Sequence, residues 1–447
     1  MTHSGSDYTK PQFQPAADYK SATSKELGIS TQWWKTFKDP KLNSLQSELL
    51  AQNLDLAAAY ARRQQALARL GISQANLLPE GDASAGVNRE KATRNGMVGD
   101  LGDEYLSQYN VGANLSYEID LWGRVRDLIN AGIADAEAAN YAISDVRVTL
   151  QTQLAQQYFA LRFLDAEMET LNSAVKTRQE NVKITTERLE EGLTSELDSA
   201  RANSELANAR AELLSLKGAR AQLENSIAVL LGRQASTFNI KPTDYVGNLP
   251  SIPAGVPAAL LYRRPDIAVA EKKVAVATAL IGVADKERYP KFSLTGNAGF
   301  SSISTSRFLK WSSAFYSVGP SASIPLFQGR RIKSNILLTQ AQREEALANF
   351  QKTALNAMAD VESALANLSA LREESVARKA SVTAATRTYE LSSLRYQEGV
   401  TSYLDVADAE RERLTAERAA VRTRARQFAA TIQLVQSLGG GFNRHSK

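Results

Sequence analysis

The stretch Arg188-Leu-Glu-Glu-Gly-Leu-Thr-Ser-Glu-Leu-Asp198 returns 207 residues later as Arg395-Tyr-Gln-Glu-Gly-Val-Thr-Ser-Tyr-Leu-Asp405. Seven of the eleven positions are identical. Further matches occur in the same order and at nearly the same distance: Gly123-Arg124 with Gly329-Arg330, and Asp55, Gly71 and Pro79 with Asp266, Gly282 and Pro290. Collinear matches of this kind predict a tandem duplication of a unit of about 200 residues.

Proline placement divides the 447 residues further. No Pro lies between Glu80 and Lys241 or after Pro325, which permits long helices, whereas Pro residues crowd into 242–265. We therefore expect an N-terminal segment at 1–40, a first repeat at 41–232, a Pro-rich insert at 233–264, a second repeat at 265–438 and a tail at 439–447. Each repeat should hold a helix, two strands and a long helix pair. The strands are expected at about 82–90 and 105–120, then at about 291–302 and 315–326, and the helix pairs at 124–232 and 330–438.

The long helices carry apolar residues at a spacing of seven. In the first repeat these are Leu154, Leu161, Met168, Val175, Val182 and Leu189; in the second they are Val361, Leu368, Val382 and Tyr389, with Ser375 as a polar interruption. A sustained heptad predicts coiled-coil packing against neighbouring helices. At 1.5 Å per residue the first helix would reach about 100 Å, which favours spanning a distance over filling a compact core.

The segments before the long helices alternate with a period of two. From Tyr105 to Ile119 the odd positions are mostly apolar and the even positions are mostly small and polar, and 292–300 and 316–326 behave likewise. Such a sheet could cover a soluble core. Its length and its small polar residues also fit strands that cross a membrane, with aromatic residues at the two interfaces: Tyr105, Tyr117, Phe300, Trp311 and Tyr316.

Four strands cannot close a barrel, and an open sheet edge has no hydrogen-bond partners in lipid. If the strands enter a membrane, several copies must therefore pool them. Pro320 falls within the fourth strand, where we expect a bulge or an edge.

Composition excludes several chemistries. The chain has no Cys, and its two His, His3 and His445, lie in the end segments. A Ser-His-Asp triad, a Cys nucleophile, a zinc site and a disulfide framework are thereby ruled out.

The net charge of +5 comes without a basic, aromatic-rich cluster, so nucleic acid is not an expected partner. No apolar run is long enough for a transmembrane helix and no signal-peptide pattern is present, so we expect a cytosolic or a mature, processed chain.

From Asp7 to Leu438 the sequence resembles the outer-membrane efflux (TolC-like) family, in its lipoprotein-type drug-efflux branch. Five motifs carry the resemblance in the family's order: Trp33-Trp34-x-x-Phe37-x-Asp39-Pro40, Asn53-x-Asp55-Leu56-x-x-Ala59, Tyr117-Glu118-Ile119-Asp120-Leu121-Trp122-Gly123-Arg124, Arg263-Arg264-Pro265-Asp266-Ile267 and Pro325-Leu326-Phe327-x-Gly329.

The resemblance implies a membrane α+β protein: a homotrimer whose twelve strands, four from each protomer, form one β-barrel in the outer membrane. Its helices would continue as an α-helical barrel through the periplasm, encircled at mid-height by the Pro-rich insert and parts of both ends. The periplasmic tips would dock onto a membrane-fusion adaptor protein that connects to an inner-membrane pump. No enzyme activity and no cofactor are implied.

Two departures from the family's pattern stand out. Members of this branch begin with a lipidated Cys shortly before an Asp-Tyr-x-x-Pro stretch. Asp7-Tyr8-Thr9-Lys10-Pro11 matches that stretch, but no Cys precedes it, so no lipid anchor is assigned to this chain. One branch also closes the periplasmic end through a Tyr and an Arg; Tyr396 matches the Tyr, whereas Thr401 stands at the Arg position.

The Gly-Thr-Ser turns have a structural and a functional interpretation. Gly permits chain reversal and Ser or Thr caps the following helix, which suffices to explain the residue types. The resemblance adds adaptor docking at the tips, formed by Gly192, Leu193, Thr194, Ser195, Gly399, Val400, Thr401 and Ser402. Leu193 and Val400 are apolar where turns are usually polar.

Asp405 and Asp408 lie three residues apart, so they share a helix face. They could be ordinary carboxylates near a helix N-terminus. The resemblance implies instead a gate, with six carboxylates of a trimer forming a ring that binds cations. Asp198 is the first-repeat equivalent of Asp405, but Arg201 replaces the second Asp.

The leading hypothesis is thus a passive outer-membrane exit duct for drugs or other toxic amphiphiles. A type I secretion outlet for proteins is a same-fold alternative. A soluble coiled-coil scaffold and a carboxylate-based enzyme are alternatives of other classes, although a scaffold needs neither the strands nor the duplication.

Overall fold

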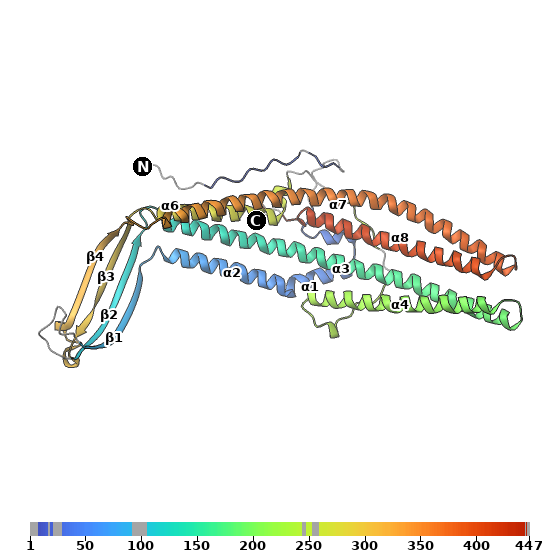
Figure 1. Cartoon of the computed structure of the whole chain (residues 1–447), viewed down its shortest axis with the longest axis horizontal. Coiled ribbons are helices and arrows are strands. Elements are labelled where there is room, and N and C mark those ends of the chain that lie inside the picture. The colour runs from blue at the N-terminus through green and yellow to red at the C-terminus, as the bar shows by residue number, and fades with distance from the viewer. Residues whose placement is uncertain are drawn as a thin grey trace. The chain divides into compact units, whose positions relative to one another are not determined.

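A computed structural model describes residues 8–16, 18–20, 29–91, 105–243, 247–252, 259–442 and 444, without the side chain of residue 261. Asp7, His3 and His445, and parts of the insert and of the tail, lie outside the described residues. One antiparallel sheet has the strand order β1-β2-β3-β4 (Figure 1). Its strands are β1 (Glu80–Lys91), β2 (Tyr105–Ile119), β3 (Lys291–Ser302) and β4 (Ala314–Ser323).

Helices make up most of the described chain. They are α1 (Pro40–Gln52), α2 (Leu54–Ala75), α3 (Arg124–Glu190), α4 (Glu196–Leu230), α5 (Leu260–Arg263), α6 (Pro265–Lys286), α7 (Arg331–Gln397) and α8 (Tyr403–Ser437), with short 3-10 turns η1 (Trp33–Phe37), η2 (Ala235–Thr237), η4 (Thr305–Arg307) and η5 (Trp311–Ser313). Helices α3 and α7 have 67 residues each, and α4 and α8 have 35 each. None of the helices in the described part of the chain combines the length and the apolar character that a membrane crossing requires.

The chain forms two compact units, and each takes segments from both halves of the sequence. One unit contains the sheet, with Ala61–Asn140 and Val269–Phe350. The other contains Phe13–Tyr60, Tyr141–Ala268 and Gln351–Lys447, including α4, α8 and the ends of α3 and α7 that meet them. The compact units therefore cut across the sequence repeats, because each unit takes residues from both repeats; among the long helices α3, α4, α7 and α8, only α3 and α7 contribute residues to both units.

The sheet has two chemically different faces. Opposite pairs such as Leu115 and Gly296 alternate along the strands with pairs such as Asn114 and Asn297, so the former point to one face and the latter to the other. The polar face carries cross-strand hydrogen bonds, among them Asn114 Nδ2 to Asp82 Oδ2 at 3.0 Å and Ser293 Oγ with Ser321 Oγ at 2.8 Å. On the apolar face Val87 and Val318 are largely exposed within one chain.

Strand β4 ends at Ser323, three residues before the expected bound of 326, because its pairing with β3 stops at the Lys291–Ser323 pair. Pro320 lies opposite Leu294 in a regular register, without a bulge. In the described chain β4 is an edge strand, the position in a sheet where Pro is found.

The motif around Trp33 builds the core of the second unit. Phe37 packs against Phe159 and Phe428, with ring centroids 4.8 and 5.7 Å away. Asp39 caps α1 by accepting hydrogen bonds from the N–H groups of Lys41 and Leu42, and it also accepts one from the Tyr158 hydroxyl at 2.7 Å. The Trp-Trp-x-x-Phe-x-Asp-Pro pattern is therefore a packing and capping device.

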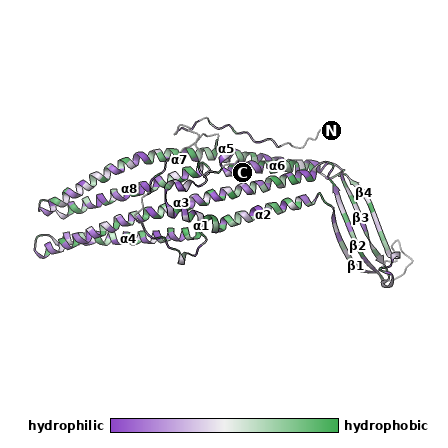
Figure 2. Cartoon of the chain, turned by 180° about the vertical axis from the view of Figure 1, so that it is seen from behind, coloured by the Kyte–Doolittle hydropathy of each residue, from purple (hydrophilic) through white to green (hydrophobic). Residues whose placement is uncertain are grey.

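The heptad seam is buried unevenly. Leu154 and Leu161 are fully buried in the aromatic core, whereas Val175, Val182 and Leu189 are only partly buried in the isolated chain. Both hydrophilic and hydrophobic residues follow the long helices along their whole length (Figure 2).

Arg264, from the Arg-Arg-Pro-Asp motif, joins three helices. Its guanidinium lies 2.7 Å from Asp266 at the start of α6, 3.1 Å from Asp360 of α7 and 3.1 Å from the Ser437 carbonyl at the end of α8. Asp145 of α3 is half-buried beside this cluster. Burial, with a smaller contribution from the charge of Asp266, raises the pKa of Asp145 to about 6.

Asp145→Asn is expected to stabilise the protein at neutral pH and to leave it unchanged at acidic pH. Because the folded-state pKa of Asp145 lies above that of the unfolded chain, folding takes up a proton between about pH 4 and pH 6, and stability falls as pH rises through that window. Thermal unfolding at about pH 7.5 and pH 4.5 checks this. A gain of equal size at both pH values would contradict it.

Candidate functional site at the helix tips

The turns between α3 and α4 and between α7 and α8 have the same backbone geometry. Gly192 and Gly399 each have φ of +74°, a conformation that side chains disfavour. In the first turn the Gly192 N–H donates to the Leu189 carbonyl and the Leu193 N–H to the Arg188 carbonyl; Gly399 and Val400 repeat both bonds. This pair of bonds is the Schellman motif, which satisfies the last carbonyls of α3 and α7.

Each following helix has a Ser at its N-cap, Ser195 for α4 and Ser402 for α8, and an Asp in its third position whose carboxylate accepts hydrogen bonds from the turn. Ser195 and Thr194 donate to Asp198 Oδ2 at 3.0 Å each. In the second turn Asp405 Oδ2 accepts from the Thr401 hydroxyl, from Ser402 Oγ at 3.1 Å and from the Ser402 N–H at 3.2 Å.

These bonds, from Thr401 first and then from Ser402, lower the pKa of Asp405 below its ordinary value, so it is ionised at neutral pH. In the single chain Asp405 therefore acts as a helix cap, in agreement with the structural interpretation of its position.

Leu193 and Val400 are exposed at the tips. The residue after the Schellman glycine usually packs back onto its own helix, yet Leu193 is 71% exposed and Val400 is 61% exposed. Leu197 and Leu404, the second residues of α4 and α8, are exposed as well. We call these four exposed aliphatic side chains at the two turn–helix junctions the tip patch.

Tyr396 makes a contact that sequence reasoning missed. The Arg188 guanidinium of α3 lies 4.6 Å from the centre of the Tyr396 ring, and Tyr396 also packs edge-on against Tyr403, with centroids 5.8 Å apart. Tyr403 is buried with Ala202 and Ala407, and burial raises its pKa to about 12. The first residue of the repeated stretch thus contacts the second repeat by a cation–π interaction.

Asp408 does not share the partners of Asp405. Its Oδ1 accepts from Arg411 Nη1 at 2.8 Å, and Arg411 Nη2 reaches Glu205 of α4 at 2.7 Å. Asp408 remains more than half exposed. In the first repeat Asp198 faces Arg201 at 3.7 Å, so only the second repeat has two carboxylates at this place.

A buried ion pair lies close in sequence to Asp408. Arg178 of α3 and Glu410 of α8 are 3.2 Å apart, with side chains 6% and 3% exposed. Arg178 also donates to the Glu205 carbonyl at 2.8 Å, and Asn181 donates to Glu410 at 3.3 Å. Burial raises the pKa of Glu410, although Arg178 opposes the shift. The pair ties α3, α4 and α8 together.

The ion pairs between α4 and α8 recur every seven residues. Arg411 pairs with Glu205, and Arg418 pairs with Glu212. Arg418 and Arg422 also hold the buried Glu167 of α3, at 2.9 and 2.6 Å. The heptad spacing of these Glu and Arg residues is visible in the sequence. Their partners are not, because which helix lies opposite depends on the packing.

The aromatic residues predicted for membrane interfaces are distributed over the sheet. Tyr105, Tyr117, Phe300 and Tyr316 occupy register positions on the apolar face, and Trp311 lies in η5, between β3 and β4. Tyr316 and Trp311 are 85% and 86% exposed. Their role at an interface stays a prediction.

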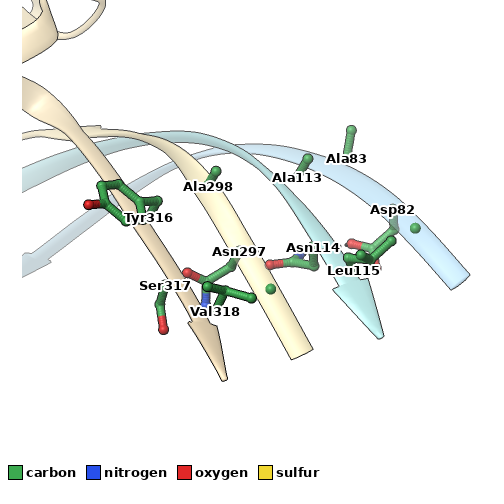
Figure 3. A pocket seen from close by; sticks show the side chains of 12 residues that line it. Asp82, Ala83, Ala113, Asn114, Leu115, Asn297, Ala298, Tyr316, Ser317 and Val318 are labelled. Carbon is green, nitrogen blue, oxygen red and sulfur yellow. Dashed lines mark hydrogen bonds between the residues drawn. The ribbon is translucent and has the colours of Figure 1, made fainter. Parts of the chain in front are cut away.

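A shallow hollow of about 580 Å³ lies on the sheet (Figure 3). It arises where Gly81 and Gly296 alternate with Leu115 and Val318 across the four strands, beside the row of Ala83, Ala113 and Ala298. It holds no convergent set of polar groups on the apolar face. Among the described residues no group of three or more His, Cys, Asp or Glu is placed to hold a metal ion.

Comparisons with known proteins all lead to outer-membrane proteins of efflux and export systems. The family described as "Outer membrane efflux protein" matches residues 45–233 and 256–440. The pyoverdine export outer membrane protein OpmQ of Pseudomonas aeruginosa is 30% identical over 430 residues, covering 95% of this chain and 90% of OpmQ. The toluene efflux pump outer membrane protein TtgC of Pseudomonas putida is 29% identical over 446 residues, covering 98% and 92%.

The solved structure of the outer-membrane channel OprN superposes with a TM-score of 0.88 at 29% identity, over 98% of this chain and 99% of OprN. Structural neighbours of this kind are trimeric channels with a helical majority and four strands per chain. The chain is therefore a member of the outer membrane efflux protein family, an outer-membrane protein of the channel-forming kind found in efflux pumps and not an enzyme.

Proposed function

We propose that three copies of this chain form a passive exit duct that exports drugs or other toxic amphiphiles. Twelve strands, four from each copy, close a barrel in the outer membrane, with the apolar face toward lipid and the polar face toward the lumen. The long helices continue the duct into the periplasm, encircled by the Pro-rich insert. The duct uses no fuel of its own, and an inner-membrane pump supplies the energy.

One observation carries the proposal: a four-stranded sheet with an apolar and a polar face, unpaired at both edges within the described chain. A sheet in lipid requires every main-chain group to be paired, so its edges must be covered by other copies. Eight strands are about the least that close a barrel, which a single copy does not reach.

The test is the state of the protein in the cell envelope. We expect it to partition with outer membranes, to be extracted only by detergent and to run as a cross-linkable, heat-modifiable trimer that conducts ions in planar bilayers. A monomer that stays in solution without detergent would overturn the proposal.

The helix tips are the docking site for a periplasmic membrane-fusion adaptor protein in this proposal. The tip patch of Leu193, Leu197, Val400 and Leu404 supports it, because exposed aliphatic groups at turns gain free energy when a partner covers them. Gly192, Thr194, Ser195, Gly399, Thr401 and Ser402 shape the two turns that present the patch.

The gate lies at the same end. Asp405 and Asp408 of three copies form a ring of six carboxylates that binds cations, and Tyr396 holds the neighbouring helices by packing on Arg188 and Tyr403. Docking of the adaptor opens the ring as packed helices slide past one another.

Replacing Asp405 and Asp408 together with Ala is expected to raise single-channel conductance and to weaken block by divalent and trivalent cations, because bound cations no longer occlude the ring. Bilayer recordings of purified trimers measure both quantities. Asp198→Ala is the matched control, since Asp198 accepts from the Thr194 and Ser195 hydroxyls as Asp405 does from those of Thr401 and Ser402. Equal changes in the control and the double variant would leave Asp405 with a capping role only.

A further inference from the structure

Both edges of the sheet end in unpaired backbone. In the described chain β1 pairs with β2 alone and β4 with β3 alone. The three residues that follow β4, Ile324–Leu326, have no strand partner there either, and Leu326 and Phe327 are 88% and 93% exposed. Under the proposed function these edges meet in neighbouring copies, so the open question is which residues face one another.

The internal duplication supplies the correspondence between strands. Strand β1 corresponds to β3 at an offset of 211, since both strands begin directly after Pro79 and Pro290. Strand β2 corresponds to β4 at an offset of 207, because Val111-Gly112 and Ser116 return as Val318-Gly319 and Ser323.

The observed registers test these offsets independently. Glu80 pairs with Ser116, and their equivalents Lys291 and Ser323 pair as well. Ala85 pairs with Val111, and their equivalents Gly296 and Val318 also pair. The two offsets taken from the sequence thus convert the β1–β2 register into the β3–β4 register that the structure shows.

The same offsets convert the β2–β3 register into one for β4 and β1. The Ser116–Thr295 pair becomes Ser323 opposite Ser84, and the Leu115–Gly296 pair becomes Ala322 opposite Ala85. We propose that β4 of one copy pairs antiparallel with β1 of a second copy in this register, which places Ser323 opposite Ser84 and continues as Ile324 opposite Ala83.

The faces of the sheet agree with this register. Ser84 and Ser323 both lie on the polar face, and Ala85 and Ala322 both lie on the apolar face. A slip by one residue would put polar positions of one copy beside apolar positions of the next, on both faces. A slip by two residues keeps the faces, and only the duplication distinguishes it from the proposed register.

The turn after β2 shows what the residues beyond β4 contact. Residues 117–119 extend β2 past its pairing with β1 and pair with β3 only. Trp122 then stacks on Tyr289 at 5.1 Å and donates to the Pro290 carbonyl at 2.7 Å. The equivalents of Tyr289 and Pro290 are Leu78 and Pro79, and Leu78 is 66% exposed. At the offset of 206 that relates Gly123 to Gly329, Trp122 corresponds to Gln328, so by this correspondence Gln328 of one copy lies against Leu78 and Pro79 of the next.

The absence of Cys from the chain makes the register directly testable. The variants S84C/S323C and A85C/A322C place a Cys pair at each proposed contact, one on each face. The controls S84C/S321C and A83C/A322C use equally small residues on the same faces, displaced by two residues. Within one copy β1 and β4 are three strand spacings apart, about 14 Å, which is beyond the reach of a disulfide.

After oxidation in outer membranes, we expect both proposed pairs to convert most of the protein into covalent dimers and trimers on non-reducing gels, and the displaced pairs to stay at the level of single-Cys variants. Stronger cross-linking of the displaced pairs would overturn the register while leaving the trimer in place. Trimers in detergent without cross-links from any pair would overturn β4–β1 pairing alone. A monomer in detergent would overturn the proposed function together with the inference.

Discussion

Efflux is expected to fall to the level of a strain without this protein when Leu193 and Val400 are both replaced by Asp. Both side chains are mostly exposed and lie at equivalent positions after the two tip glycines. Burying a charge at the centre of an apolar contact costs far more than removing a methyl group, so the adaptor should no longer dock. Minimum inhibitory concentrations for amphiphilic antibiotics, measured in the native host, give the readout.

Glu191→Ala with Glu398→Ala is the matched control. These exposed residues directly precede the same two glycines, and their replacement changes charge at the tips without touching the tip patch. Resistance should be retained in the control, and both variants should still yield trimers. Full resistance in the Leu193→Asp/Val400→Asp variant, with normal amounts of trimer, would show that the adaptor does not dock at the tip patch.

Arg178→Met is expected to destabilise the tip region by about 3–5 kcal/mol, because it leaves Glu410 buried without its ion-pair partner. The Glu410 pKa, already raised by burial, would then rise further. The bonds of Arg178 to α4 and α8 are lost at the same time, so the closed state should loosen. A lower unfolding temperature and a raised single-channel conductance are the expected measurements.

The double variant Arg178→Met/Glu410→Gln separates the two effects. It removes the buried charge, so it should recover much of the lost stability. It does not restore the links to Glu205, so conductance should stay raised. A double variant less stable than Arg178→Met would show that the unpaired carboxylate is not the source of the loss.

Local pattern was sufficient to locate the secondary structure. Period-two alternation marked residues such as Tyr117 and Phe292 as strand positions, and the absence of Pro marked the long helices. The end of β4 was placed three residues too late because Ile324 and Leu326 continue the alternation, whereas strand assignment requires a pairing partner. The alternation of apolar and polar residues shows which face of a strand is apolar. Whether those residues count as strand depends on whether a neighbouring strand pairs with them.

The candidate site was predicted less completely. The Gly-Thr-Ser turns and the Asp pair could be found because turn and cap residues act through their own backbone. Arg188 on Tyr396 and Arg178 with Glu410 were missed, since each joins residues more than 200 positions apart. In the sequence of an amphipathic helix, a charged residue that faces solvent cannot be told from one that faces a buried partner.

The sequence by itself determined the duplication, the periodicities and the absence of Cys and of catalytic His, because these are properties of residue order and composition. Only the tertiary structure decided that Glu410 is buried against Arg178 and that Arg411 reaches Glu205. Burial and ion pairing of this kind follow from which helices pack together. Those contacts join distant parts of the chain and exist only once the helices are assembled.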